Sequence, residues 1–452
     1  MAQSRRDQVQ AQSYVLGRLT SALVTGDPER SENPHRRTVT GVVVGVLITA
    51  LVVAGSGLYG YLRPGGSTAW RKPGTLVLEK ETGSRYVFTD GQLRPVLNYA
   101  SARLLFGADP PRVSVSSRSL TGVTRGLPVG VVAAPDALPR ADALTGVTWT
   151  ACPAVGSGLT LALATEASGE PLAERAVVVS PGRGQNFLIW RGHRYQLGAA
   201  WMARVFGYDG PVVPVDSRWP ELLPPAADIN PVEVPGRGEP GPRVQGEQTL
   251  IGQLFVVRLD GADDRYYVLL RDGFSPLTAT GYAIVAADPQ TAKAYPGGAV
   301  APIPVGPPAL AEVPVSERRL VPQQAPPVPP AIGVAGDERA WCVRRDAAGI
   351  TEVVADAPAA GQSPDTDQSQ DAAAVIRLAP GSGGLVAPGR TGQTAGTARY
   401  LITDAGLRYP VPTTDAAEAL GYAPDTATPV PPEWLRLLPE GPALDLSAVR
   451  GS

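Results

Sequence analysis

One long apolar run dominates the pattern of hydrophobic and polar positions. Residues 38–62 contain no charged side chain, and Arg37 and Arg63 bracket them. At about 1.5 Å per residue, a helix of this length reaches roughly 37 Å, enough to cross a ~30 Å hydrocarbon core with some tilt. A cleaved signal peptide is the alternative, but the preceding polar segment is too long for one and no A-x-A cleavage site follows. The run therefore predicts a retained membrane helix over 38–62.

Small residues recur inside this run at a spacing of four. Gly41 and Gly45 form a G-x-x-x-G pair, and Ala50 and Ala54 repeat the spacing. Small side chains at this spacing let a second helix approach closely in a membrane. We interpret these four positions as candidates for packing against another transmembrane helix.

Basic residues flank the run at both ends, so charge alone barely sets its orientation. They are Arg30, Arg36 and Arg37 before it and Arg63, Arg71 and Lys72 after it. Size and cysteine placement discriminate better, because both cysteines lie in the large C-terminal part, as a disulfide in an oxidising compartment requires. We therefore expect residues 1–37 in the cytoplasm and the bulk of the chain outside it.

The first 37 residues carry a helical pattern of their own. Val9, Leu16, Leu19 and Leu23 fall near one face, and the Gly-Asp-Pro sequence at 26–28 ends the run. We interpret this apolar face as a docking surface for a cytoplasmic partner. A helix lying on the lipid surface is the alternative, but six arginines against four acids give the segment too little charge to favour it.

Four later segments share one plan: an apolar strand, a turn with glycine, a second strand and an alanine-containing helical stretch. They span residues 85–107, 186–207, 265–288 and 399–421. Alternating β-forming residues around a glycine turn predict a hairpin, which the helical stretch then covers with its apolar face. Such a unit buries little by itself and must lean on neighbours.

The outer part also reads as a duplication. RWPELLPP at 218–225 follows the second segment much as PPEWLRLLP at 431–439 follows the fourth. We predict an α+β protein in which a single transmembrane helix precedes an elongated, pseudo-twofold outer domain of four hairpin-plus-helix repeats around a β-rich core. The expected divisions are 1–37 (head), 38–62 (membrane helix), 63–119 (repeat 1), 120–185 (first core half), 186–240 (repeat 2), 241–310 (repeat 3), 311–397 (second core half) and 398–452 (repeat 4).

The two cysteines occupy matching places in the duplicated halves. Equivalent residues of a pseudo-twofold protein can meet across the dyad, so we predict a Cys152–Cys342 disulfide. In the chain-entropy treatment, a bond closing so long a loop contributes roughly 4–5 kcal/mol, as an upper figure. Two unpaired buried thiols are the alternative.

Composition excludes several function classes. The net charge is −2 and no lysine/arginine cluster is interleaved with aromatic residues, which argues against a nucleic-acid partner. Two histidines and two cysteines are too few to supply a transition-metal site readily.

No catalytic motif stands out either. The chain has no G-x-x-x-x-G-K-[ST] loop, and the Pro-Gly-Arg-Gly sequence at 181–184 lacks the context that cradles phosphates. His193, the outer histidine, follows a turn glycine and is expected to be exposed. The acid pairs Asp263/Asp264 and Asp365/Asp367 lack EF-hand spacing. We therefore predict no catalytic residue, no metal site and no cofactor.

The whole pattern resembles the EccB family, membrane core components of actinobacterial type VII (ESX) secretion systems. The residues that carry the resemblance are the head RRDQVQAQSYVLGRLTSALVTGDP, the single span, the segment RYVFTDGQLRPVLNYASARLL, APDALP at 134–139, TWTACP at 148–153 and L-P-x-G-P-x-L-D at 438–445. The resemblance implies an inner-membrane complex with the FtsK/SpoIIIE-type ATPase EccC, polytopic EccD, EccE and a mycosin protease.

The leading hypothesis is therefore a non-catalytic structural subunit of the inner membrane that bridges the cytoplasmic and outer sides, with self-association among its candidate contacts. A membrane-tethered module that binds peptidoglycan is one alternative. A nucleotide hydrolase, in practice an ATP hydrolase, without a recognisable phosphate loop is the other.

Overall fold

The structure is a computed structural model of the chain. It describes residues 5–25, 34–62, 68–143, 147–154, 158–164, 168–209, 212–259, 261, 263–336, 339–356, 375–390 and 397–450. The end of the head helix predicted at 26–28, and Arg30, Arg63, Asp365 and Asp367, lie outside these residues.

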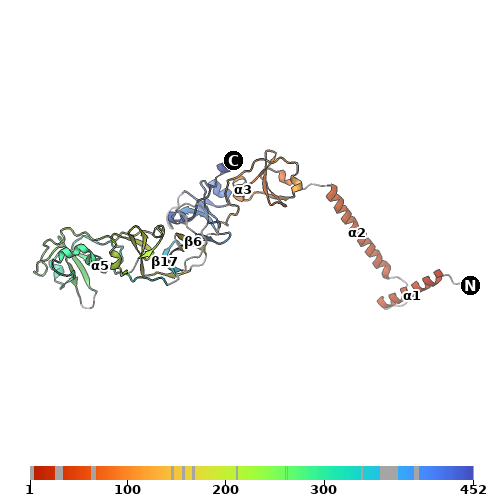
Figure 1. Cartoon of the computed structure of the whole chain (residues 1–452). Coiled ribbons are helices and arrows are strands. Elements are labelled where there is room, and N and C mark those ends of the chain that lie inside the picture. Colours follow the sequence, from red (N-terminus) through yellow and green to blue (C-terminus); the bar gives the residue numbers. More distant parts are fainter. Residues whose placement is uncertain are drawn as a thin grey trace. The chain divides into compact units, whose positions relative to one another are not determined.

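Contacts divide the chain into two units, which we describe separately. The smaller unit comprises Met1–Lys72, Val77–Ser84 and Arg112–Thr124, and the larger comprises Pro73–Leu76, Arg85–Pro111 and Arg125–Ser452. Figure 1 follows the chain through its elements, from the red N-terminal helices to the blue C-terminal sheet.

Two long helices open the smaller unit. Helix α1 spans Arg5–Thr25 and α2 spans Pro34–Leu62, so α2 contains the predicted apolar run. The unit also holds η1 (Ala69–Arg71), β4 (Arg112–Val115), η2 (Ser117–Leu120) and all but the first residue of β1 (Leu76–Glu79).

The four predicted hairpins are present. They are β2 (Arg85–Thr89) with β3 (Gln92–Pro95), β9 (Gln185–Trp190) with β10 (His193–Leu197), β13 (Arg265–Leu270) with β14 (Gly273–Leu277), and β20 (Tyr400–Ile402) with β21 (Arg408–Pro410). In the first two turns both central residues have positive φ: Asp90 and Gly91, and Arg191 and Gly192. This is the conformation that matches the twist of two antiparallel strands.

Each of the last three hairpins is extended by two further strands, so that three sheets share one order. The orders are β10-β9-β8-β11, β14-β13-β12-β15 and β21-β20-β19-β22. The added strands are β8 (Ala176–Gly182), β11 (Val213–Pro214), β12 (Leu254–Val257), β15 (Ile303–Val305), β19 (Gly384–Pro388) and β22 (Thr428–Val430). Strands β8 and β19 precede the sequence-based starts at 186 and 398, so these two sheets begin earlier than the predicted segments.

The hairpin helices differ in length for a local reason. The helices α3 (Tyr99–Phe106), α5 (Ala279–Ala287) and α7 (Thr414–Ala419) each start after a residue whose side chain caps the first turn, namely Asn98, Thr278 and Thr413. In the second hairpin unit the N-cap residue is Trp201, whose side chain makes no capping hydrogen bond, and α4 covers only Met202–Val205. The predicted helical stretch at 199–206 is therefore shorter than expected.

A proline-containing segment runs along the outer edge of each hairpin. Isolated parallel bridges join Val96 to Val129, Leu197 to Ile229, Phe274 to Val315 and Arg408 to Glu440. These segments cover the edge of the second hairpin strand, and a covered edge cannot recruit a strand from another chain.

The centre of the larger unit is a six-stranded sheet with the order β18-β6-β5-β16-β17-β7. Its strands are β5 (Thr148–Pro153), β6 (Leu159–Ala164), β7 (Glu170–Pro171), β16 (Ala340–Arg345), β17 (Thr351–Asp356) and β18 (Val375–Leu378). The β5–β6 hairpin and the β16–β17 hairpin meet at an antiparallel β5–β16 pair. Each hairpin also receives an edge strand from the other part of the chain, since β7 pairs with β17 and β18 with β6.

Helices and buried apolar residues join the sheets in pairs. Helix α4 packs on α5, and α3 packs on α7 and on the terminal helix α9 (Leu446–Arg450). The central core collects residues from the six-stranded sheet and from the sheets at both its ends. The remaining short helices are η3 (Pro220–Leu222), η4 (Pro289–Ala294), α6 (Ala309–Glu312), η5 (Pro424–Thr426) and α8 (Pro432–Leu435).

Candidate functional site

The apolar helix α2 has no partner in the described chain. Its stretch Thr38–Tyr59 is the one helix among the described residues that is long and apolar enough to cross a membrane, and none of it is buried. Leu51 is 70% exposed and Val53 is 65% exposed. Exposing so many aliphatic side chains to water would cost about 25 cal/mol for each Å². The helix therefore requires a nonpolar environment that lies outside this chain.

The small residues of α2 lie on two sides of the helix. At about 100° per residue, Ala50 and Ala54 are rotated by about 180° from Gly41 and Gly45. No heavy atom from another described part of the chain lies within 4 Å of a Cβ built on either glycine. One straight neighbouring helix cannot contact both pairs, so the spacing offers two packing faces where one was expected.

The predicted apolar face of α1 is exposed. Val9, Leu16, Leu19 and Leu23 are 66%, 60%, 55% and 83% exposed and fall within an arc of about 80° around the helix. The structure thus places the four residues on one face and shows nothing that covers it within the described chain.

The predicted disulfide is present at the centre of the six-stranded sheet. Cys152 of β5 and Cys342 of β16 are bonded across neighbouring antiparallel strands, with Cα atoms 4.3 Å apart. They lie one step beyond the Ala151–Val343 pair of the β5–β16 register. Both are buried, with Val354 of β17 beside them. The bond therefore joins the β5–β6 hairpin to the β16–β17 hairpin.

Two tryptophans from the matching Pro-rich segments pack into the core around this sheet. Trp219 and Trp434 are both completely buried. The indole Nε1 of Trp219 donates to the carbonyl oxygen of Trp341 at 2.9 Å. Trp434 instead meets Trp149 edge to face, with ring centroids 6.3 Å apart, and its Nε1 has no acceptor among the described residues.

A cavity of about 140 Å³ lies beside these segments. Its charged lining residues are Glu221, Arg345, Arg390 and Glu433. Burial lowers the pKa of the Arg345 guanidinium, which donates to the Pro429 carbonyl at 3.2 Å. Arg390 and Glu433 are 3.7 Å apart. Two acids and two bases thus line the cavity, and the Oε2 atom of Glu433 has no hydrogen-bond partner among the described residues.

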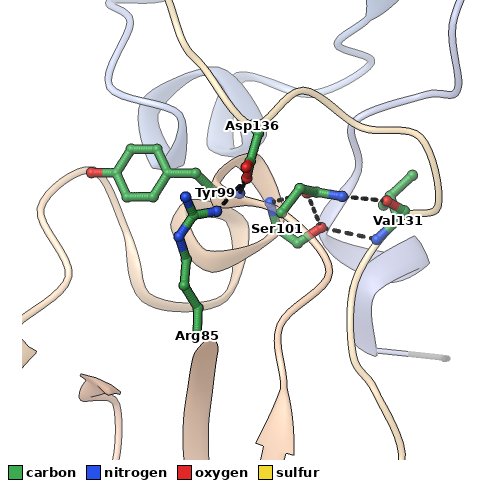
Figure 2. A network of polar contacts seen from close by, with 6 residues as sticks. Arg85, Tyr99, Ser101, Val131 and Asp136 are labelled. Carbon is green, nitrogen blue, oxygen red and sulfur yellow. Dashed lines mark hydrogen bonds and ion pairs between the residues drawn. The ribbon is translucent and has the colours of Figure 1, made fainter. Parts of the chain in front are cut away.

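Near the start of α3, one carboxylate of the APDALP sequence holds two groups together (Figure 2). Asp136 accepts hydrogen bonds from the backbone N–H of Tyr99 at 2.9 Å and from the Arg85 guanidinium. The side chain therefore supplements the helix cap and ties this sequence to the first hairpin.

The cap residue of α3 extends the same network. The Asn98 amide oxygen accepts from the backbone N–H and the hydroxyl of Ser101, and its NH₂ donates to the Val131 carbonyl at 2.7 Å. The Val131 N–H donates back to the Ser101 hydroxyl at 2.9 Å. Each buried polar group is paired, so the network acts as a structural clamp.

Further hydrogen bonds join α3 and the APDALP sequence to the segment that follows α7, next to the β21-β20-β19-β22 sheet. Arg103 donates to the Leu420 carbonyl at 2.6 Å, and the Tyr422 hydroxyl donates to the Pro139 carbonyl at 2.7 Å. Burial raises the pKa of Tyr422, and the nearby Arg103 partly opposes this. The phenol is therefore a neutral hydrogen-bond donor at ordinary pH.

The residues weighed for chemistry do not converge. His193 is exposed at its turn, and its Nδ1 lies 2.9 Å from the Arg191 carbonyl. Asp264 lies on the surface near Arg258 and Tyr266. The Pro-Gly-Arg-Gly sequence at 181–184 forms the turn that joins β8 to β9. Among the described residues there is no group of three or more histidine, cysteine or acidic side chains placed to hold a metal ion.

Sequence reasoning missed one buried ion pair. Arg237 and Asp288 are 2.9 Å apart with side chains 7% and 5% exposed, and Asp288 also caps η4. The two residues are 51 positions apart, and no short motif links them. The Asp-Pro sequence at the start of η4 could have indicated that Asp288 caps a helix, but nothing in the sequence indicated Arg237 as its partner.

Known proteins are similar to this chain along nearly its whole length. The family model described as "Type VII secretion system ESX-1, transport TM domain B" matches residues 1–451. The ESX-1 secretion system ATPase EccB1 of Mycobacterium tuberculosis (strain H37Rv) is 27% identical, with 98% of this chain and 93% of that protein aligned. The ESX-3 secretion system ATPase EccB3 of Mycolicibacterium smegmatis is also 27% identical, covering 97% of this chain and 89% of that protein.

Solved structures give the same result. A chain from the structure of an intact ESX-5 inner membrane complex superposes with a TM-score of 0.65 at 26% identity, covering 99% of this chain and 95% of that chain. A chain from the periplasmic assembly of the same complex has a TM-score of 0.65 at 25% identity, with 85% and 97% coverage.

Proposed function

Because the chain belongs to the EccB family of type VII secretion proteins, we propose that it is a structural, membrane-anchored subunit of an ESX-type inner-membrane secretion complex. The observation that carries the proposal is the end-to-end match to a chain of an ESX-5 inner membrane complex, which leaves no large part of either chain unaligned. The one helix among the described residues that is long and apolar enough to span a membrane supports the same function, because an anchored subunit needs only one span.

We propose further that the subunit is not catalytic. The related proteins carry the word ATPase in their names. The sequence offers no phosphate loop, and the polar groups of Asn98, Ser101 and Val131 near the start of α3 are paired with one another. In this hypothesis His193→Ala and Asp264→Ala leave secretion nearly intact. Loss of secretion from either change alone, with the complex still assembled, would contradict it.

The proposed orientation places α1 in the cytoplasm and the β-rich part outside it. The buried disulfide supports this, because disulfides persist in oxidising compartments. Protease added to spheroplasts should digest the chain beyond α2 and leave the head protected. Protection of the C-terminal part would reverse the orientation.

The exposed face of α1 is the proposed docking surface for the cytoplasmic side of the machine. The resemblance to EccB proteins names the ATPase EccC as the partner of interest, with EccD, EccE and the mycosin as further subunits. Burying an unpaired charge in such a contact costs several kcal/mol. The variant Leu16→Asp/Leu19→Asp should therefore insert and fold outside the membrane, yet recover much less of the ATPase subunit in affinity purification and fail to secrete.

The chain provides a matched control for that experiment. Gln10 and Ser13 have the same spacing of three but lie outside the apolar arc. Gln10→Asp/Ser13→Asp adds the same charge and should assemble normally. Equal behaviour of the two double variants would refute the docking surface.

The two faces of α2 are proposed to contact two different transmembrane helices, one at Gly41 and Gly45 and the other at Ala50 and Ala54. Cysteines placed beside each pair should crosslink to different neighbours, of which one could be a second copy of this chain. Crosslinks from both faces to a single helix would refute the arrangement.

We also propose that the outer part consists of two halves, each with a central hairpin and its adjoining sheets. The sequence bounds of repeats 2 and 4 need to start earlier in this scheme, since β8 and β19 pair with their hairpins. Binding of the purified protein to peptidoglycan would favour the cell-wall-binding alternative. Nucleotide turnover that is lost when one acidic side chain is replaced would favour the hydrolase alternative.

A further inference from the structure

The basic residues that follow α2 have no role in the positive-inside rule if the head is cytoplasmic. Arg71 and Lys72 are exposed, nine and ten residues beyond the end of α2 at Leu62. A chain extends at most ~3.6 Å per residue, so both side chains stay within roughly 40 Å of the point where the helix ends. The two side chains can therefore contact the environment of α2 at its C-terminal end.

The same sign of charge continues through the part of the smaller unit that follows α2. Its described residues include five basic side chains, and all five are exposed: Arg71, Lys72, Lys80, Arg112 and Arg118. They include two acids. Glu79 is buried, and Glu81 accepts hydrogen bonds from the backbone N–H and the hydroxyl of Ser117, which hold the pKa of its carboxyl below the usual value.

The larger unit has the opposite charge. It contains eight more acidic than basic residues, although the whole chain has a net charge of only −2. A negatively charged surface therefore attracts the part of the chain next to α2 and repels the larger unit.

The basic side chains stand on ordered structure. Trp70 is completely buried, and the Arg71 guanidinium lies 5.2 Å from the centroid of its ring. The short helix η1 packs against β4, which begins with Arg112. The Lys80 N–H donates to the Val115 carbonyl at 2.9 Å, which joins the end of β1 to the end of β4. The five charges thus belong to one small folded part of the chain.

We propose that this surface, Arg71, Lys72, Lys80, Arg112 and Arg118, binds the anionic phospholipid headgroups of the leaflet where α2 ends. A lysine or arginine next to an anionic membrane surface strengthens binding by about 1 kcal/mol, or roughly fivefold. The proposal requires only that α2 spans the membrane; it stands whether or not the docking and secretion roles do.

Amine labelling offers a direct test with a built-in control. The chain has three lysines: Lys72 and Lys80 belong to the proposed surface, and Lys293 is exposed in the larger unit. Full-length protein is placed in nanodiscs of phosphatidylcholine alone or of phosphatidylcholine with an equal part of phosphatidylglycerol. An amine-reactive reagent should label Lys72 and Lys80 several-fold more slowly in the anionic discs, while Lys293 is labelled equally in both.

Salt and substitution then identify the cause. At ~1 M salt the Debye length falls to about 3 Å, so the two lysines should regain their neutral-disc rates. Arg71→Gln/Arg112→Gln/Arg118→Gln keeps both lysines and should remove most of the protection. Arg183→Gln/Arg243→Gln/Arg265→Gln removes three exposed charges from the larger unit and should leave it unchanged. Equal labelling in the two discs, or protection that persists in high salt, overturns the proposal.

Discussion

The two halves that we propose for the larger unit use the same apolar anchors but different polar contacts. Trp219 and Trp434 are both fully buried beside the six-stranded sheet, yet Trp219 donates to a backbone carbonyl and Trp434 has no acceptor among the described residues. The hairpin turns differ in the same way. Gly192 closely approaches the Thr351 carbonyl of β17, whereas Gly406 approaches the Ile376 side chain of β18.

This difference shows which part of a duplication is easily kept. Apolar packing depends on volume and area, so it tolerates small shifts of backbone and sequence. A hydrogen bond depends on distance and angle, and a small displacement removes it. The four predictions below compare the halves, beginning with the bond that joins them.

Removing the disulfide should have the largest effect on stability. In the chain-entropy treatment, a bond between residues 190 positions apart contributes about 5 kcal/mol as an upper figure. Cys152→Ala/Cys342→Ala should lower the free energy of unfolding by a large part of this, measured by denaturant unfolding of full-length protein in detergent. Membrane insertion should not change, because α2 does not depend on the bond.

The turn glycines should respond unequally to alanine. Their φ values, +69° and +76°, are nearly equal, so alanine carries a similar backbone cost of about 1–3 kcal/mol at each. At Gly192 the new Cβ would lie 2.2 Å from the Thr351 oxygen, and at Gly406 it would lie 3.1 Å from Ile376 Cγ2. A carbonyl cannot rotate away as a side chain can, so Gly192→Ala should cost about 1–3 kcal/mol more. Equal losses in the two variants would show that the turns are not held as described.

Phenylalanine at the two tryptophans isolates one hydrogen bond. Both changes remove similar buried volume, but only Trp219→Phe leaves the Trp341 carbonyl without its indole donor. We expect Trp219→Phe to be the more destabilising by about 1 kcal/mol in equilibrium unfolding. If Trp434→Phe costs as much or more, the polar difference between the halves is not energetically important.

The smallest effect concerns pH and is confined to the first half. The Arg218 guanidinium lowers the pKa of Asp216 below its ordinary value of 3.8, and the Arg218 backbone N–H adds to this. A carboxyl with a lowered folded-state pKa adds stability above its unfolded pKa, and this stability is lost as pH falls through the folded value. Asp216→Asn should therefore lower the melting temperature at pH 7 and have little effect well below pH 4. A constant difference across this range would exclude the ion pair as its cause.

The sequence by itself determined features that depend on neighbouring residues or on duplication. The charge-free run specifies α2, the glycine turns specify the four hairpins, and the matched cysteines indicate the disulfide. Local rules suffice for the helix and the turns, because each depends mainly on its own few residues, whereas the disulfide was predicted from the matching positions of the two cysteines.

Only the tertiary structure decided how distant segments meet. No local sequence pattern predicts that β7 and β18 pair with the opposite hairpins or that β8 and β19 join the sheets of the hairpins that follow them. The contact of Asp136 with the start of α3 is equally absent from any local pattern. These contacts depend on close packing and on the pairing of buried polar groups. Both involve segments that are far apart in the sequence, so they cannot be deduced from one segment alone. The second hairpin unit shows both influences: Trp201 at the N-cap of α4 makes no side-chain capping bond, and the close approach of Asn230, whose Oδ1 would lie 2.3 Å from an added Cβ, leaves no room for a side chain at Gly198.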